Sequence, residues 1–356
     1  MKSKFVLIFL ILICFFNLSL SFRFTVTADP RDEQEDWIFA LQQIKEKIGG
    51  IGEFHVTAGD QDPEDERYAD FVSVFGESAI WCPVWGNHDI QNETNIIWLR
   101  EFNKKSPLVV NKGPEGSENS TFSWDVDPVH FVVLNEQYNG SLDHGIYRAD
   151  IVDELYDWLV DDLEKNKNPS VIVFGHAPAY PQHRHLNDSL NNDIPKRDRF
   201  WKLMNQHVEI YFCGHTHWYS AIQVGNEIVG QEYTYQIDAG AARWSHNNNN
   251  ISTFLNVFVN EEKSEIQVHV WQSKQVMGEF EVVERLDIPF LQITSTKTPA
   301  GGDKYFIFAI VLFVIFIAIF LIVNFIFNKI KGNNLKVTPN NEYEIENLIE
   351  QEDELL

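Results

Sequence analysis

The sequence is poor in cysteine, with three in 356 residues. One of them lies in an apolar N-terminal segment, which leaves Cys82 and Cys213 for the rest of the chain. Small secreted domains without a large core are usually held by several disulfides, so this low count excludes that class. A hydrophobic core must therefore stabilise the fold. We expect Cys82 and Cys213 to be buried thiols within strands, with a disulfide between them as the open alternative.

Basic residues are also scarce: 28 Lys and Arg stand against 52 Asp and Glu, which gives a net charge of −24. Nucleic acids are bound through Lys and Arg contacts to phosphate, so this balance argues against nucleic-acid binding. Part of the charge lies in segment 342–354, which has no base and is typical of a solvated, disordered tail. Within it, Glu344–Ile349 resembles an acidic dileucine sorting signal, so a sorting adaptor is an alternative partner for the tail.

Long apolar runs occur at two places, and the first lies at the N-terminus. It follows two lysines, spans 5–16 and precedes a small-x-small pattern at Ser19 and Ser21, as in a secretory signal peptide. We predict a cleaved signal peptide over residues 1–21, in preference to a buried N-terminal strand. Cleavage would leave Phe22 as the new N-terminus.

The second apolar run, 305–323, contains no charge and is long enough to cross a bilayer as a helix. Three lysines between 329 and 336 follow it, which indicates a cytoplasmic side. We predict a short stalk over 294–304, a transmembrane helix over 305–327 and an acidic cytoplasmic tail over 328–356. The chain would then be a single-pass type I membrane protein of the secretory or endolysosomal system or of the cell surface.

Asparagine sequons give a weak check on this topology. Five Asn-x-Ser/Thr sequons lie in the proposed lumenal part and none lies in the tail, although an Asn-rich chain gains some by chance. The candidate glycosylation sites are Asn92, Asn119, Asn139, Asn187 and Asn250.

Five segments of the lumenal part share one pattern, a short apolar strand followed at once by polar residues. Such runs, rich in β-branched and aromatic residues, are typical of strands buried on both faces. Helical patterns occur at 33–50, 151–165 and 197–207, and strand pairs around polar turns at 120–136 and 252–273. This alternation predicts one layered α/β domain. The strand segments end at Asp29, Asp60, Asp89, His176 and His217.

The polar residues at the strand ends indicate a metal centre. Ligand sites of α/β sheets gather at the carboxyl ends of strands, so these side chains are expected to converge. They offer carboxylate oxygens, an amide oxygen and imidazoles, a set that suits Zn, Mn or Fe. A carboxylate such as Asp60 can bridge two cations. The sequence therefore predicts one or two divalent metal ions as cofactors.

Four motifs in a fixed order carry a resemblance to a known family. They are GD at 59–60, GNHD at 86–89, GH at 175–176 and GHTH at 214–217. In this order, each behind an apolar strand, they resemble the signature of the calcineurin-like metallophosphoesterases. The resemblance covers roughly Phe24 to Trp244, within a domain that we place at 22–293. It implies an α/β fold, a two-sheet β-sandwich of mixed sheets flanked by α-helices, with a dinuclear centre at one edge.

The resemblance also implies roles for single residues. His88 would assist the departing alkoxide as an acid or hydrogen-bond donor, which suits a group that titrates near neutrality. An acid would orient the His88 ring, with Asp89 and Asp62 as alternatives; Asp89, our second catalytic candidate, would otherwise brace its turn. The implied ligands are Asp29, Asp60 and His217 for the first metal, and Asp60, Asn87, His176 and His215 for the second.

One position departs from the family pattern, which has Asp-x-His in its first block where this chain has Asp29-Pro30-Arg31. A guanidinium group has no lone pair for a metal, so one expected ligand is missing. Water or a neighbour such as Asp32 could fill the gap, or the first site could be weak and the centre mononuclear. Alternatively, Arg31 holds a phosphate oxygen of the substrate, or it faces solvent and pairs with a local acid.

We therefore predict a metal-dependent hydrolase of phosphate mono- or diesters that acts in the lumen or outside the cell. Metal-activated water would attack phosphorus while His88 assists the leaving group. The alternative is a catalytically weak binding or trafficking protein on the same fold, which Arg31 favours. His183 and His185, in the loop after the GH motif at 175–176, are expected to be solvated, with lining of the substrate pocket as the alternative.

Overall fold

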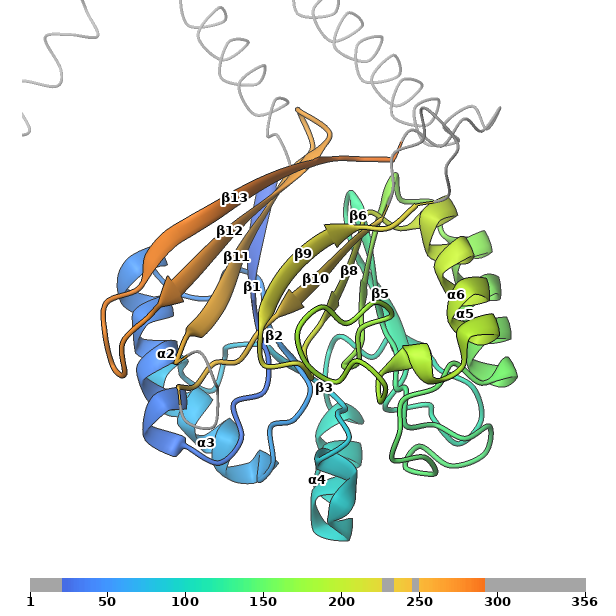
Figure 1. Cartoon of the computed structure of the whole chain (residues 1–356), viewed down its shortest axis with the longest axis horizontal. Coiled ribbons are helices and arrows are strands. Elements are labelled where there is room, and N and C mark those ends of the chain that lie inside the picture. Colours follow the sequence, from blue (N-terminus) through green and yellow to red (C-terminus); the bar gives the residue numbers. More distant parts are fainter. Residues whose placement is uncertain (1–20, 226–233, 245–249, 292–356) are drawn as a thin grey trace, which may run out of the picture. The chain divides into compact units, whose positions relative to one another are not determined.

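Two mixed β-sheets packed face to face form the centre of the fold (Figure 1). The structure, a computed structural model, describes residues 21–225, 234–244 and 250–291. The predicted stalk, transmembrane helix and tail, and all of the predicted signal except Ser21, lie outside the described residues. Within the described ranges, no helix is long and apolar enough to cross a bilayer.

The first sheet combines parallel and antiparallel strands. Its described strands are β1 (Ser21–Thr27), β2 (His55–Ala58), β3 (Trp81–Val84), β11 (Ser252–Asn260), β12 (Glu265–Ser273) and β13 (Glu281–Pro289). They lie in the order β13-β12-β11-β1-β2-β3. β1, β2 and β3 run parallel, while β11 pairs antiparallel with both β1 and β12. The carboxyl ends of β1, β2 and β3 therefore share one edge of the sheet.

The second sheet is also mixed. Its described strands are β4 (Asn111–Lys112), β5 (Phe122–Val126), β6 (Val129–Val133), β7 (Ser170–Phe174), β8 (Ile210–Cys213), β9 (Tyr219–Gln223) and β10 (Tyr235–Ala239). They lie in the order β4-β5-β6-β7-β8-β10-β9, in which β6, β7, β8 and β10 are parallel. The parallel strands again place their carboxyl ends together.

The core between the sheets is rich in phenylalanine. Phe24 of β1 stacks on Phe54 at 4.9 Å between ring centroids. Its edge faces Phe131, Phe174 and Phe212 of the second sheet, at 5.4, 6.1 and 6.3 Å. All five rings are buried, and each stabilises the fold by about 1.5–3 kcal/mol relative to an exposed ring. This apolar contact fixes how the two sheets meet at the edge that carries the polar loops.

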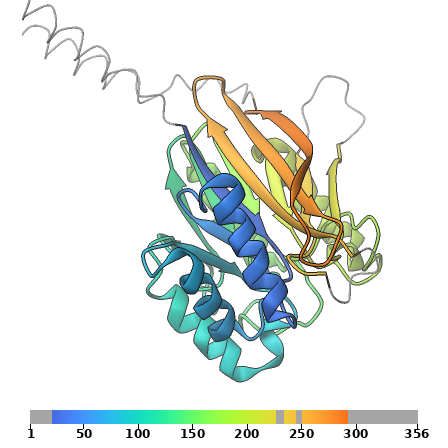
Figure 2. The same cartoon turned by 90° about the vertical axis from the view of Figure 1, so that its left-hand side faces the viewer.

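Helices cover the outer face of each sheet. The described helices are α2 (Gln34–Ile48), α3 (Glu64–Phe75), α4 (Glu93–Asn103), α5 (Asp153–Lys165) and α6 (Ile194–His207), with 3₁₀ turns η1 (Asp89–Gln91) and η2 (Leu190–Asn192). α2 and α3 pack on the first sheet through Trp37, Leu41 and Phe71, and α2 lies in front of that sheet in Figure 2. α5 and α6 pack on the second sheet through Leu159 and Phe200.

The structure confirms the predicted fold class of two mixed sheets with flanking helices. The helical patterns at 33–50, 151–165 and 197–207 are α2, α5 and α6, and α2 ends at Gly49 in the left-handed conformation (φ 77°). The two predicted strand pairs are β5–β6 and β11–β12. Both cysteines outside the N-terminal segment are buried and free, as expected for core thiols. The sequence analysis contained no prediction for α3, α4, β4, β9, β10 or β13.

The described chain begins and ends at the same end of the first sheet. Ser21 of β1 pairs with Asn260 of β11, Asn260 pairs with Glu265 of β12, and Glu265 pairs with Pro289 of β13. The carboxyl end of β1 lies at the other end of the same strand. Any segment that continues from Pro289 therefore leaves the domain away from the loop that carries Asp29.

Candidate metal centre

The loops after β1, β2, β3, β7 and β8 meet at one edge of the sandwich. Four of their residues adopt the left-handed backbone conformation: Asp29 (φ 52°), Asp60 (φ 56°), His215 (φ 70°) and His217 (φ 57°). Such non-glycine residues cost about 1–3 kcal/mol each and cluster at functional sites. Gly59 precedes Asp60, and a Cβ on it would lie 2.1 Å from Nδ1 of His176. The glycine therefore lets the imidazole pack directly on the loop.

The ring nitrogen Nε2 of His176 faces side-chain oxygens of Asp60 and Asn87. Its Nδ1 lies 2.9 Å from the carbonyl oxygen of Ala58 and donates to it, which leaves Nε2 as an acceptor. Nε2 lies 3.3 Å from Oδ1 of Asp60 and 3.2 Å from Oδ1 of Asn87. Burial opposes a charged imidazole, yet the carboxylates of Asp60 and Asp29 outweigh it and raise the pKa of His176. Positive charge is thus favoured at this position, and the acceptors fit a divalent cation.

His215 offers a second imidazole to the same place. Its Nε2 is buried and has no hydrogen-bond partner among the described residues. Burial and the neighbouring His176, 5.0 Å away between ring centroids, lower the pKa of His215 well below its usual value. The ring is therefore neutral, and a buried lone pair without a donor fits a metal ligand.

Asp29 contacts one implied ligand of each metal position, His215 and His217. Its Oδ2 accepts the backbone N–H of His215 at 2.9 Å, while Oδ1 lies 3.3 Å from Nε2 of His217. Burial would raise the pKa of Asp29, but the interaction with His217 outweighs burial and lowers it. Ligand atoms of Asp29, Asp60 and His176 all lie within 4.8 Å of one another. This buried trio could hold one ion.

His217 is surrounded by arginines as well as by Asp29. Nη1 of Arg184 lies 2.9 Å from Nδ1 of His217. Nη2 of Arg243 lies 3.4 Å from Nδ1 and 3.5 Å from Nε2 of the same ring. The sequence predicted His217 beside Asp29 but gave no signal for Arg243, and Arg184 was hidden in a run of loop residues.

His88 lies at the mouth of the centre. Its side chain is 24% exposed, and its Nε2 lies 3.9 Å from Oδ2 of Asp60. Nδ1 lies 2.9 Å from the side-chain amide nitrogen of Gln91, so Gln91 is the residue that positions the ring. Burial lowers the pKa of His88, and the charge of Arg31 adds to this effect, while Asp60 opposes it.

Asp89 does not contact the His88 ring. Its Oδ2 accepts the backbone N–H groups of Asp60 at 3.0 Å and Gly86 at 2.7 Å. Its Oδ1 accepts the backbone N–H of Gln61 at 2.8 Å. The carboxylate is buried and joins two loops of the centre. These hydrogen bonds fit the brace that the sequence analysis gave as the alternative role of Asp89, whereas Gln91 holds the His88 ring.

Arg31 lies on the His88 side of the centre. Its Nε lies 3.7 Å from Oδ2 of Asp32, and its side chain is 20% exposed. The charge of Arg31 lowers the pKa of His88, after burial, and opposes the rise that burial and Asp60 cause in the pKa of Asp62. The local pairing with an acid thus exists, but the guanidinium also lies within electrostatic reach of the catalytic candidate.

The loop between β7 and η2 contributes a residue that the sequence analysis undervalued. The ring of His185 lies 4.1 Å from that of His215, and its Nδ1 lies 2.9 Å from Oδ2 of Asp188. His185 is 24% exposed, so its position fits the alternative of a residue that lines the substrate pocket. His183 is exposed and lies against Trp218, 4.8 Å between ring centroids. Only the folded loop brings His185 to the metal ligands, because nothing in its spacing marks it.

A buried acid that the sequence did not reveal fixes His176. Oε2 of Glu136 accepts the backbone N–H groups of His176 at 3.1 Å and Ala177 at 2.6 Å. The hydroxyl of Tyr211 donates to the other carboxylate oxygen. Burial raises the pKa of Glu136 despite these hydrogen bonds. Glu136 sits after an apolar strand in the same way as the motif residues, but without a glycine to mark it.

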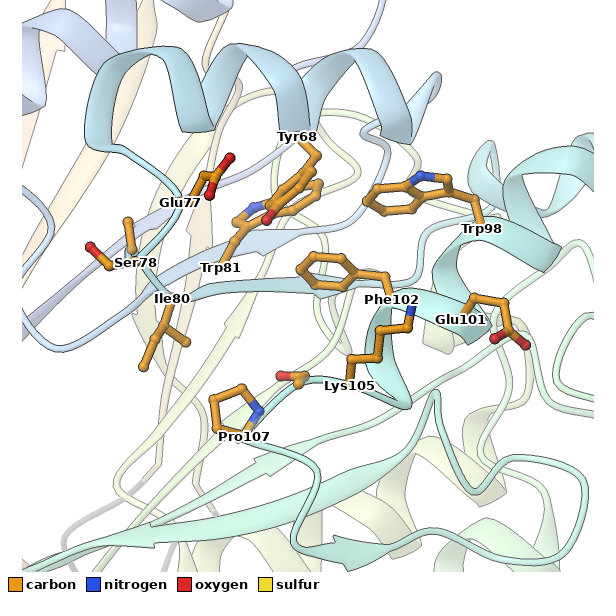
Figure 3. Close-up of a pocket in the computed structure, with 12 residues that line it drawn as sticks. Tyr68, Glu77, Ser78, Ile80, Trp81, Trp98, Glu101, Phe102, Lys105 and Pro107 are labelled. Carbon is orange, nitrogen blue, oxygen red and sulfur yellow. The ribbon is translucent and has the colours of Figure 1, made fainter.

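A separate aromatic pocket of about 650 Å³ lies between α3 and α4. Figure 3 shows Tyr68, Trp81, Trp98 and Phe102 gathered along it. Trp98 and Phe102 stack at 5.0 Å between ring centroids. None of the residues of the metal centre lines this pocket, so it belongs to the packing of the helical layer.

Known proteins are similar to this chain in sequence. Acid phosphatase type 7 of mouse is 26% identical over 234 residues, covering 61% of this chain and 47% of that protein. "Probable inactive purple acid phosphatase 9" of Arabidopsis thaliana is 23% identical over 165 residues, covering 43% of this chain and 24% of that one. The chain thus spans less than half the length of the curated relatives it matches.

Among solved structures, a metallophosphoesterase from Sphaerobacter thermophilus is 12% identical with a TM-score of 0.32, covering 70% of this chain and 87% of that chain. The family model described as calcineurin-like phosphoesterase matches residues 22–219, a range that includes every motif listed above. This match spans more than half of the chain. The chain belongs to the calcineurin-like phosphoesterase family.

Proposed function

We propose that this protein is a metal-dependent hydrolase of phosphate mono- or diesters. The observation that carries the proposal is the lone pair of His176 facing the oxygens of Asp60 and Asn87 at 3.2–3.3 Å. A bound divalent cation supplies Lewis acidity toward water and the phosphoryl group. The residues that would hold it are Asp29, Asp60, Asn87, His176 and His215.

The residues at the opening of the metal centre would bind the phosphoester or donate a proton to it. His88, positioned by Gln91, directs Nε2 toward the centre and can donate a proton or a hydrogen bond to the departing oxygen. His185, paired with Asp188, lies beside His215 and can contact a second substrate oxygen. The forked donors of Arg31 can hold a phosphate oxygen on the His88 side. These groups come from three separate loops, which surround the centre.

The proposed place of action is the lumen or the cell exterior, as a type I membrane protein. Three features of the chain support this proposal: the N-terminal apolar run, the run at 305–323 and the sequons between them. β1 begins at Ser21, so cleavage before Phe22 would remove one strand residue.

A purified full-length chain tests the activity. We expect hydrolysis of p-nitrophenyl phosphate or bis-p-nitrophenyl phosphate with added Mn²⁺ or Zn²⁺, and loss of this activity in Asp60→Asn. Arg199→Gln is the matched control, since Arg199 pairs with Asp153 on the helical layer. Hydrolysis by the wild type that does not exceed that of Asp60→Asn would contradict the proposal.

The alternative function is that of a catalytically weak binding or trafficking protein on the same fold. Arg31 in the first block favours it, and one relative carries the word "inactive" in its name. The same assay separates the two, because a binding protein would retain metal without turnover.

A further inference from the structure

The ring of His217 is held by a side chain that can only donate. Nη1 of Arg184 lies 2.9 Å from Nδ1 of His217. A guanidinium group has five N–H donors and no acceptor, so Nδ1 must supply the lone pair to this contact. The neutral imidazole then carries its proton on Nε2.

The second ring nitrogen, Nε2, then carries the proton and has no lone pair for a metal ion. Nε2 of His217 lies 3.3 Å from Oδ1 of Asp29, a buried oxygen without a hydrogen-bond partner among the described residues. A metal ligand needs a free lone pair on the coordinating nitrogen. In the structure as folded, neither nitrogen of His217 offers one. His176 differs, since its Nδ1 faces an acceptor, the carbonyl oxygen of Ala58, so the neutral ring carries its lone pair on Nε2.

A further guanidinium lies at the same ring. Nη2 of Arg243 lies 3.4 and 3.5 Å from the two ring nitrogens of His217, and its side chain is fully buried. Nη1 of Arg243 donates to the carbonyl oxygen of Arg31 at 3.0 Å and also to Asp32. These bonds anchor the cation in place. A fixed positive charge this close to His217 repels a divalent cation strongly, because a buried site screens charge poorly.

Three observations thus argue against a metal ion at the first position. Arg31 stands where the family has a ligand histidine, Arg184 takes the lone pair of His217, and Arg243 adds a buried charge. The second position is intact, with Asp60, Asn87, His176 and His215 converging.

We infer that this chain binds a single divalent metal ion, and that guanidinium groups replace the second ion of the family's centre. Arg184 and Arg243 then supply fixed positive charge beside His217, where the first ion would stand. Such charge can attract and orient the phosphoryl oxygens of the substrate. The inference shares its site with the proposed function but concerns metal content, so the two can fail separately.

Metal content of the purified full-length chain tests the inference. After chelation and reloading with excess Mn²⁺, elemental analysis should give about one ion per chain. Electron paramagnetic resonance should show the hyperfine-split signal of an isolated Mn²⁺. Two ions per chain with the signal of an exchange-coupled pair would overturn the inference, whether or not the protein hydrolyses phosphoesters. One ion without hydrolysis would leave the inference standing and sink the proposed function.

Two variants locate the cause. His217→Ala should retain its single ion, because His217 is not a ligand; loss of the ion would overturn the inference. The double variant Arg31→His with Arg184→Gln should gain a second ion and the coupled signal, because it restores a ligand and frees Nδ1 of His217. A double variant that keeps one ion would overturn the assignment of this exclusion to Arg31 and Arg184. Thermal unfolding of each variant, with Arg199→Gln as the control, verifies that the fold is intact.

Discussion

The carboxylate of Asp89 accepts the backbone N–H of Asp60 at 3.0 Å, which ties together two loops that lie far apart in the chain. The same carboxylate accepts N–H groups from Gly86 and Gln61. Asp89→Asn would place an amide NH₂ group against these donors. We expect a loss of about 2 kcal/mol or more in the free energy of unfolding, because buried donors would lose their acceptor.

Urea unfolding with a chelator present measures this loss without the metal contribution. Asp153→Asn, at the exposed Asp153–Arg199 pair, is the matched control and should change the stability by less than about 1 kcal/mol. Equal stability of the two variants would contradict the bracing role of Asp89.

His88 should matter most for poor leaving groups. His88→Asn removes a proton donor, so we expect turnover of an alkyl phosphate to fall by about 100-fold, a typical size for general acid catalysis. Turnover of p-nitrophenyl phosphate should fall much less, since p-nitrophenolate leaves without a proton. Metal content should stay unchanged in this variant. An equal loss on both substrates would argue against a role at the leaving group.

The pH dependence of wild-type turnover gives a separate check on His88. Burial lowers the pKa of His88 below its usual value of 6.5, with Asp60 opposing. The protonated form therefore declines as pH rises through a range below 6.5. We expect turnover of alkyl phosphates to fall over that range, and a turnover that keeps increasing toward pH 8 would contradict the assignment.

His55 should make the fold sensitive to acid. It is fully buried between Thr25 and Thr27, whose hydroxyls lie 2.7 and 2.9 Å from its ring nitrogens, and burial lowers its pKa to about 3. The unfolded chain takes up the proton near pH 6.5, so stability is full above 6.5 and declines as pH falls toward 3. The decline should approach about 1.4 kcal/mol per pH unit.

His55→Gln should remove this slope while it keeps hydrogen bonds to the threonines. Unfolding free energies measured between pH 4 and pH 7 for both proteins give the comparison. The same slope in the variant would show that another group titrates.

Glu209 should give stability the opposite pH dependence to His55. Its carboxyl accepts the backbone N–H groups of Val171 at 2.6 Å and Leu291 at 2.8 Å, and burial raises its pKa to about 7. The folded state holds the proton that the unfolded state loses near pH 4.5, so stability is full below 4.5 and falls as pH rises through 7. The total change is about 3 kcal/mol, and Glu209→Gln should abolish it. Denaturation of both proteins at pH 5 and pH 8 tests the sign.

The sequons should be used unequally. Oδ1 of Asn139 accepts hydrogen bonds from Ser141 and Leu142, and its amide nitrogen packs against Gly145. Asn139 and Asn187 are both exposed, so the local hydrogen bonds of Asn139 are what distinguishes the two. In a eukaryotic secretory host we expect a glycan on Asn187 and none on Asn139, as measured by mass spectrometry after enzymatic deglycosylation. A glycan on Asn139, or an unmodified chain, would contradict this expectation or the lumenal location.

The sequence by itself determined the fold and most of the metal centre. Apolar strands ending in Asp60, His176 and His217 identified the motif loops, because buried parallel strands leave a strong hydrophobic signal and their carboxyl ends must share an edge. α3 and β13 escaped prediction, since half-exposed elements with mixed polar residues have a weak periodic pattern. Spacing along the chain could not reveal Glu136, because it needs the neighbouring strand to bring Tyr211 to it.

The tertiary structure alone decided what surrounds the motif residues. The sequence showed that Arg31 departs from the family, but it left four outcomes open. Arg184 and Arg243 reach His217 from distant segments, and the guanidinium groups of both contact its ring. A motif names the ligand residue, whereas its ability to bind metal depends on which donors meet the ring. Those donors come from segments that meet only after the sheets have packed.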